Sequence, residues 1–590
     1  MNLPKFLTAV DSYTKEMSHI ELESFIHHIA CVLPEEKRAD FIEILKIEKQ
    51  ITEPNSVKIQ LKNQIQPLLK QLSEIEQELD KIEAGDSYLI GNENEYYYHD
   101  WYDDEEEDEE DEYEFEDPDG LLLILDKAIQ LVHQCVDNEL YKEGYILANR
   151  LTTLPVYVEG EYSDYYEDDL LLSDLNDYEL LKSDFDQFVL DALYLAYMGN
   201  ELKERSEILY QMMVELGNVT LENILQHGKE ELEQFDEFLM LWIEYLSNLS
   251  ERYAEKFLLE AYELVGDNEE LLLANARKYV KKHPSLYRQY LLQTLGDRTI
   301  QKLFEVGMEA LSAISSTYTI RSEIALLTAN YALQLNKTEG AEQCWVEAFC
   351  SNTAAINYMR LYLECKDYSK YKEKIKKQYE YIAERRKIYN ISFPSEELRE
   401  NCITEQEYCT LLFLDGEFEI LIRKYMNVKE ALGWSMTFMK KGIALLLLSL
   451  FQGKELPVGL KYMAESAIEA FHFSVEEYQK GLNTKIKEDN FSFFWNRFCE
   501  WNKKQNRSEK EKEELVAKLE KWISYRVEGI MQGNHRKYYG ECASFIAALG
   551  EVKEYRGELL GKQNFMQSYK IKYPRRTAFH QELYNFGLVK

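Results

Sequence analysis

The chain has 590 residues, of which 45% are apolar, and its 68 basic against 107 acidic residues give a formal net charge of −39. This length exceeds what one hydrophobic core usually organises, and the apolar content is too high for overall disorder. Such an acidic surface repels phosphates and anionic lipids, so we expect no direct binding of nucleic acid or membranes. Gly (25) and Pro (10) are scarce, which favours long helices over an all-β fold.

Residues 1–90 predict a small helical domain. Within it, apolar residues alternate steps of four and three, as in a coiled-coil seam, at Leu61, Ile65, Leu68, Leu72, Ile75, Leu79 and Ile82. Pro67 interrupts this seam and predicts either a kink or two shorter helices.

An acidic tract, Asp103–Glu112, follows with ten consecutive carboxylates flanked by aromatic residues. Like charges in succession repel, so we predict a disordered linker over residues 91–119, and we expect residues 120–590 to fold without the part before it. The alternative is a docking site for a basic protein partner, with aromatic side chains as apolar anchors. The candidate partner-binding residues are Tyr98, Trp101, Asp103, Asp104, Glu105, Glu106, Glu107, Asp108, Tyr113 and Phe115.

A third interpretation of the tract is docking onto a basic segment of the same chain. Two basic islands stand out, at residues 371–387 (YKEKIKKQYEYIAERRK) and 569–576 (YKIKYPRR). Each is also explained by a solvated helix face, which is the usual role of such a charge run.

From residue 120 onward, helical patterns come in pairs, which predicts repeats over 120–390 and C-terminal repeats over 391–590. The acidic stretch 157–180 lacks a long period and predicts a loop or short helices, whereas the apolar run 442–451 predicts a buried helix too short to span a bilayer. In the clearest pair, Ala329, Ala341 and Ala348 occupy small positions and Trp345 a large one. Their spacing resembles a tetratricopeptide repeat.

These patterns predict an all-α fold: an irregular array of helical repeats resembling tetratricopeptide repeats, preceded by the small helical domain. The stretches 141–166 and 538–583, with an acidic segment before the first of them, also resemble the helical region of bacterial helical-repeat proteins that accompany or carry a SWIM-type zinc finger. The finger itself needs Cys-x-Cys and Cys-x-His pairs. This chain offers only His133 and Cys135, so the resemblance implies a fold and no activity.

Motifs for known chemistry were not found. The sequence has no P-loop, no Gly-x-Gly-x-x-Gly fingerprint, no Gly-x-Ser-x-Gly elbow and no His-Glu-x-x-His pair. We therefore expect no catalytic residues, no cofactor and no metal site. The nine scattered cysteines favour reduced thiols in a cytoplasm.

The leading functional hypothesis is a non-enzymatic scaffold or adaptor, because stacked helix pairs expose extended surfaces that bind proteins or peptides. One alternative is an acidic decoy that occupies a basic or nucleic-acid-binding protein. A further alternative is an enzyme with an unrecognised site, which would require a deep polar pocket.

Overall fold

The structure is a computed structural model of the 590-residue chain. Helices dominate the described part, which confirms the all-α fold class. The described residues are 54–82, 90–92, 114–117, 120–160, 168–293, 299–385, 395–427 and 430–589, except positions 218, 229 and 267, together with positions 25, 26, 28, 29, 37 and 38.

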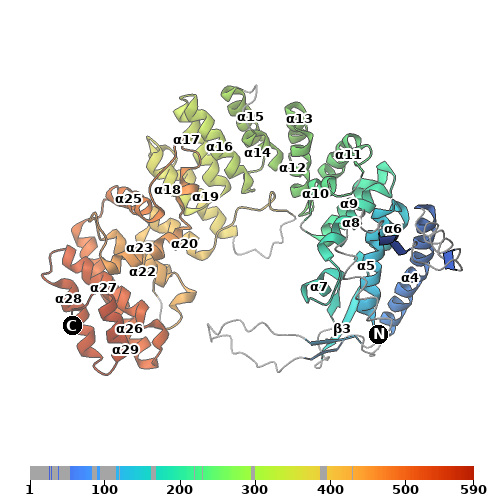
Figure 1. Ribbon diagram of the computed structural model, residues 1–590. Coiled ribbons are helices and arrows are strands. Elements are labelled where there is room, and N and C mark those ends of the chain that lie inside the picture. Colours follow the sequence, from blue (N-terminus) through green and yellow to red (C-terminus); the bar gives the residue numbers. More distant parts are fainter. Residues whose placement is uncertain are drawn as a thin grey trace. The chain divides into compact units, whose positions relative to one another are not determined.

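The chain divides into two compact units, residues 1–245 and 246–590. The boundary between the units lies inside a helix, whereas the sequence predicted boundaries at residues 91–119 and near residue 390. The helices of the first unit (Figure 1) are α4 (Pro54–Ile82), α5 (Leu121–Asp137), α6 (Tyr141–Thr152), α7 (Leu172–Asp177), α8 (Phe185–Met198), α9 (Leu202–Leu216), α10 (Leu221–Gln226) and α11 (Phe235–Asn248), the last of which crosses the boundary.

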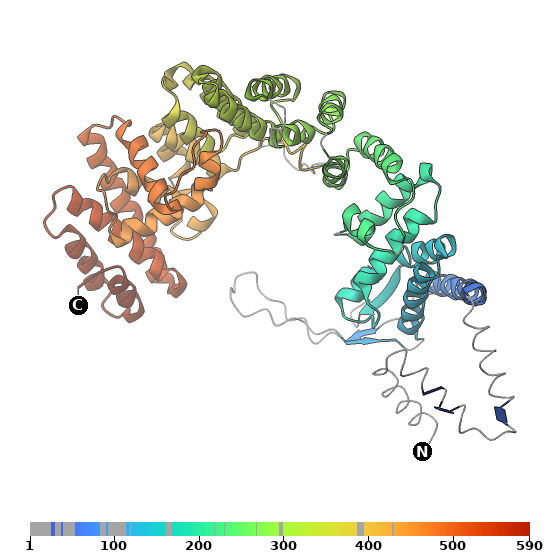
Figure 2. The ribbon, with the colours of Figure 1, turned by 45° about the horizontal axis from the view of Figure 1, so that its top comes forward.

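Helix α4 packs against α5 and α6 and so belongs to the first unit rather than to a separate domain (Figure 1 and Figure 2). The first four seam positions, Leu61 to Leu72, are buried as predicted. Two ion pairs join the helix to its neighbours: Lys58 to Glu139 at 2.9 Å and Lys62 to Glu143 at 2.6 Å. The helix continues through Pro67, so the prediction of two shorter helices was wrong.

A small four-stranded sheet in the first unit was not predicted. Its order is β2-β1-β3-β4, with β1 parallel to β3 and the other pairs antiparallel; the strands are β1 (Ile90–Asn92), β2 (Glu114–Glu116), β3 (Val156–Gly160) and β4 (Asp168–Leu170). The register pairs Ile90 with both Glu116 and Glu159. Both ends of the predicted linker 91–119 are therefore paired strands, and the stretch 157–180 holds two strands besides the short helix α7.

The second unit contains the remaining helices of the described chain. They are α12 (Ala254–Val265), α13 (Glu269–Tyr279), α14 (Ser285–Leu292), α15 (Ile300–Ala313), α16 (Ile320–Gln334), α17 (Thr338–Ser351), α18 (Ala355–Glu364), η2 (Tyr368–Lys370), α19 (Lys372–Arg385), α20 (Glu405–Leu414), α21 (Phe418–Tyr425), η4 (Trp434–Met436), α22 (Met439–Ser449), α23 (Val458–Phe471), α24 (Val475–Gln479), α25 (Asn490–Lys503), α26 (Glu509–Gly533), η5 (Arg536–Tyr538), α27 (Tyr539–Tyr555), α28 (Gly561–Lys572) and α29 (Thr577–Asn585).

Helices of the second unit pack mainly on their neighbours in sequence, as expected of a repeat array. The pair α16–α17 contains the predicted repeat positions: Ala329, Ala341 and Ala348 are fully buried, and Trp345 is 4% exposed. Small residues let the two helices approach closely, which confirms the predicted pattern. Helix α22 likewise buries every residue from Gly442 to Ser449, so the apolar run 442–451 contributes to the core.

The array is irregular because its C-terminal part folds back on earlier helices. Helices α24 and α25 pack on α18, and the indole of Trp501 donates to the carbonyl of Leu414 at 2.9 Å. Local signals still set helix starts. Thr404 accepts from the N–H of Glu407 at 3.2 Å while Glu407 accepts from the N–H of Thr404 at 2.7 Å, a reciprocal cap that satisfies two otherwise unpaired donors.

Candidate functional site

The net negative charge of the chain comes from the first unit. Residues 1–245 hold 60 acidic and 17 basic residues, a net charge of −43, whereas residues 246–590 hold 47 acidic and 51 basic residues, a net charge of +4. The overall value of −39 therefore hides a nearly neutral second unit. Electrostatic exclusion of anionic partners applies to the first unit and much less to the second.

The predicted partner-binding residues lie almost wholly outside the described residues. Phe115 is the exception, as the middle residue of β2, where its backbone pairs with that of Gly91. Their role as a docking site for a basic partner therefore stays a prediction.

One buried cluster contains a histidine, a serine and a glutamate, which are residue types of a hydrolytic triad, but its hydrogen bonds differ from those of a triad. His283 Nδ1 lies 2.6 Å from Glu397 Oε1, and its Nε2 faces the carbonyl of Leu249 at 3.0 Å. The Ser285 hydroxyl donates to Glu397 rather than to the imidazole. All three side chains are buried. In a Ser-His-acid triad the imidazole takes the proton of the serine, and this arrangement is absent here. The cluster instead ties the segment around Glu397 to the first turn of α14.

A second polar cluster, in the first unit, joins two histidines to one buried carboxylate. Asp191 Oδ2 lies 2.9 Å from His133 Nδ1, and Asp191 Oδ1 lies 2.7 Å from His227 Nε2. This contact links α5, α8 and the residue after α10. Nearby Cys135 is buried, and burial raises the pKa of its thiol to about 12, so it stays protonated and is a poor metal ligand. Within the described residues no group of three or more His, Cys, Asp or Glu is arranged to hold a metal ion.

A third candidate site depends on a loop that two buried side chains hold in place. Arg360 is 1% exposed and donates to the carbonyls of Glu477 and Tyr478, the latter at 2.8 Å. Burial lowers the pKa of Arg360 to about 10, so the guanidinium remains charged at neutral pH. The indole of Trp345 donates to the carbonyl of Gly481 at 2.8 Å. These two buried side chains hold the end of α24 and the following turn against α17 and α18.

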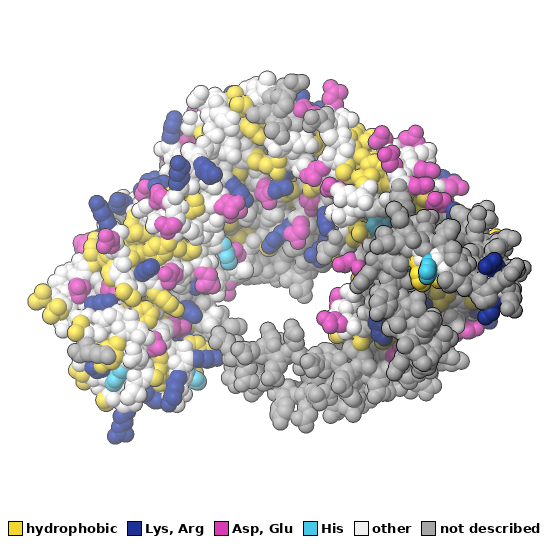
Figure 3. Space-filling view, viewed as in Figure 1, with side chains coloured by type: hydrophobic (Ala, Val, Ile, Leu, Met, Phe, Trp, Pro, Cys, Tyr) yellow, Lys and Arg dark blue, Asp and Glu magenta, His cyan; other side chains and the backbone are white. Residues whose placement is uncertain are grey.

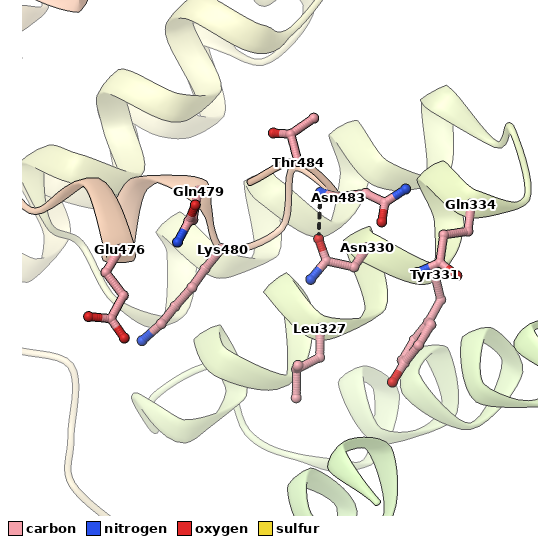
Figure 4. A pocket seen from close by; sticks show the side chains of 9 residues that line it. All are labelled: Leu327, Asn330, Tyr331, Gln334, Glu476, Gln479, Lys480, Asn483 and Thr484. Atoms are coloured by element: carbon pink, nitrogen blue, oxygen red, sulfur yellow. Dashed lines mark hydrogen bonds between the residues drawn. The ribbon is translucent and has the colours of Figure 1, made fainter. Parts of the chain in front are cut away.

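A crevice of about 470 Å³ lies between this loop and helix α16 (Figure 4). The main-chain N–H of Asn483 donates to Asn330 Oδ1 at 2.8 Å and joins the two walls. The crevice is lined by Leu327, Asn330, Tyr331 and Gln334 on one side and by Glu476, Gln479, Lys480, Asn483 and Thr484 on the other. Because buried residues anchor both walls, its shape is preformed.

Four of the nine residues that line this crevice carry a side-chain amide: Asn330, Gln334, Gln479 and Asn483. Each amide offers both a donor and an acceptor without carrying charge. In the described part of the chain, the amides of Gln334 and Asn483 make no hydrogen bond, and each side chain is exposed. The site therefore suits a neutral ligand with alternating donors and acceptors. Sequence reasoning missed it, because its one local signal was the spacing of Asn330 and Gln334 by four residues.

No family model matches this chain, and no curated protein matches it. A search of solved structures finds one described as "Circular tandem repeat protein with novel repeat topology and enhanced subunit contact surfaces", with 13% identity and a TM-score of 0.17, covering 79% of this chain and 86% of that one. A TM-score this low supports no argument about function. The resemblance to SWIM-associated helical regions stays a prediction.

None of the described helices is both long and apolar enough to cross a bilayer.

Proposed function

We propose that this protein is a non-enzymatic scaffold or adaptor that binds extended segments of partner proteins, and that the crevice beside α16 is one of its binding sites. The observation that carries this proposal is the preformed, amide-lined crevice. A peptide main chain presents alternating N–H and C=O groups, which is the pattern that Asn and Gln side chains match. Asn330 and Gln334 lie one helical turn apart on the same wall.

The dimensions of the crevice fit a short extended segment. From Leu327 to Gln334 the helix rises about 10 Å, which is the length of about three residues of extended chain. Lys480 and Glu476 stand on the opposite wall and would select among flanking charged residues. Recognition of the main chain by neutral amides makes this binding only weakly dependent on salt.

The test selects binders from a random peptide library on the full chain and measures their affinity for two variants. Gln334→Ala with Asn483→Gly removes two amides. Because Asn483 has φ of 51°, glycine keeps its backbone conformation without strain. The matched control is Gln343→Ala, an exposed amide on α17 outside the lining.

We expect the double variant to weaken the binding of selected peptides by about thirtyfold, since two hydrogen bonds contribute about 1 kcal/mol each. The control should leave their binding unchanged. Peptides that bind the double variant as well as the wild type would place their site elsewhere. Failure to select any peptide would contradict the scaffold proposal itself.

A second candidate function is an acidic decoy or regulator of a basic protein. The net charge of −43 on residues 1–245, against +4 on residues 246–590, favours it. Replacing Asp103–Glu112 by Gly and Ser at equal length separates the two functions. Loss of a salt-sensitive partner supports the decoy, whereas binding of crevice peptides should not change.

A further inference from the structure

The two basic islands of the sequence differ in the structure. On α19, four cations of the first island each meet a carboxylate: Lys374 with Glu347 at 2.8 Å, Lys377 with Glu373 at 3.2 Å, Arg385 with Glu400 at 2.8 Å, and Lys376 with Glu417. Most cations of the first island that the structure describes, in residues 371–385, are therefore paired within their own unit.

The second island, at the end of α28 and in the turn after it, keeps its charge. Lys572 and Arg575 are exposed, and neither forms an ion pair with a carboxylate of the described chain. Lys572 Nζ lies 5.5 Å from the centre of the Tyr573 ring. Arg576 donates to the carbonyl of Met531 at 2.7 Å and to the side chain of Asn534, so it fixes this turn against the end of α26.

That contact brings a further cation to the same region, because η5 (Arg536–Tyr538) begins three residues after the end of α26 at Gly533. Tyr539 and Tyr573 both pack edge-on against Phe579, with their ring centres 5.7 and 6.2 Å from that of Phe579. We define the C-terminal patch by four cations, which are Arg536, Lys572, Arg575 and Arg576.

Two carboxylates lie on elements next to the C-terminal patch. Glu528 of α26 acts electrostatically on Tyr573, and Glu582 of α29 accepts from the Asn585 amide at 3.2 Å. Figure 3 shows Lys and Arg side chains at the lower end of the region where α26 and α29 lie in Figure 1. Ile571, 68% exposed, adds an apolar side chain beside them. Lys572 and Arg575 therefore present positive charge that no carboxylate of the described residues pairs with, beside apolar and aromatic surface.

We propose that the C-terminal patch binds the acidic tract, Asp103–Glu112, of a second copy of this chain. The tract supplies ten consecutive carboxylates opposite the four cations of the patch, and the aromatic residues that flank it match the apolar part of the patch. A nucleic acid is the less suitable anion, because its binding would bring a polyanion to a chain whose first unit has a net charge of −43. The proposal is independent of the crevice beside α16.

The test measures self-association of the full chain by sedimentation at about 0.1 M and about 1 M salt, where the screening length falls from about 10 Å to about 3 Å. We expect concentration-dependent association at the lower salt and loss of it at the higher. Lys572→Glu with Arg575→Glu should weaken association by at least about tenfold, since like charges then face each other. Lys377→Glu on α19 is the matched control and should change nothing.

Complementation decides whether the contact joins two copies. One variant has the reversed patch and the natural tract, and the other has the natural patch and a Gly/Ser segment in place of Asp103–Glu112. Neither should associate alone, but their mixture should, because it restores one contact between tract and patch. Circular dichroism checks that both variants fold. A monomeric wild type, a patch-reversed variant that associates normally, or a mixture that fails to associate would each overturn the proposal.

Discussion

Replacement of Trp345 tests the packing of the repeat array and the formation of the crevice together. Trp345 is 4% exposed and donates its indole N–H to Gly481, which is 136 residues away in the sequence. Trp345→Phe keeps an aromatic ring but removes the donor and leaves the buried Gly481 carbonyl without it. Trp345→Ala also opens a cavity beside Ala341 and Ala348.

The two variants should differ in magnitude. An orphaned buried carbonyl costs about 1–3 kcal/mol, so we expect Trp345→Phe to lower the free energy of unfolding by that amount. Trp345→Ala should lower it by about 3–5 kcal/mol, the range for large-to-small changes of aromatic residues in a core. Trp522→Phe is the control, because Trp522 is only half-buried and makes no hydrogen bond within the described residues.

The assay must separate the two units, since a chain of two units need not unfold in one transition. Pulse proteolysis in urea, read by mass spectrometry, reports the stability of residues 246–590 by itself. In both Trp345 variants, hydrogen exchange at the main-chain N–H of Asn483 should also rise, because the loop that holds the crevice open loses an anchor. A loss below about 1 kcal/mol for Trp345→Ala would refute the assignment of Trp345 to the packed repeat position.

Three further predictions concern the second unit. Gly307→Ala should destabilise it by about 1–3 kcal/mol, because the new Cβ would lie 2.1 Å from Thr328 Oγ1. Gly340→Ala should instead stabilise it by up to about 1 kcal/mol, because the nearest atom to its new Cβ is 3.5 Å away. Equal effects of the two variants in urea denaturation would contradict this reasoning. Arg360→Met should lower the free energy of unfolding by about 3 kcal/mol, because the carbonyls at the end of α24 lose their donors. A smaller loss than that caused by Trp345→Phe would show that the guanidinium is not the main anchor of the loop. Burial and a neighbouring carboxylate raise the pKa of Glu255 from 4.5 to about 7, so the folded state holds this proton more tightly than the unfolded state. The stability that Glu255 contributes should therefore be complete below pH 4.5 and be lost as the pH rises through about 7. This pH dependence must be absent in Glu255→Gln if Glu255 is its source.

Helices were predictable because their signal is local. The spacing of Ala329, Ala341 and Trp345 specifies which faces of two adjacent helices can meet, and this pair forms as expected. The continuous apolar run of α22 similarly required burial on all sides. Of the two outcomes predicted at Pro67, the two shorter helices do not form, because packing of α4 on α5 and α6 stabilises one helix that includes the proline.

The sheet of the first unit was unpredictable for the opposite reason. Its strands have three to five residues, too few to show an alternating pattern, and acidic residues dominate their surroundings. Ile90 pairs with Glu159 far along the chain. A strand this short exists only because a partner strand satisfies its main-chain groups, and no local pattern reports that partner.

The sequence by itself determined the all-α class, the buried faces of the helices and the positions of the acidic tract and basic islands, because each follows from the order of neighbouring residues. Tertiary structure alone decided which charges remain available: Lys374 meets Glu347, whereas Arg575 meets no carboxylate of the described chain. It also decided that Gln334 and Asn483 line one crevice. Ion pairing and cavity formation depend on distances between residues far apart in sequence, and those distances are set by packing of the whole unit.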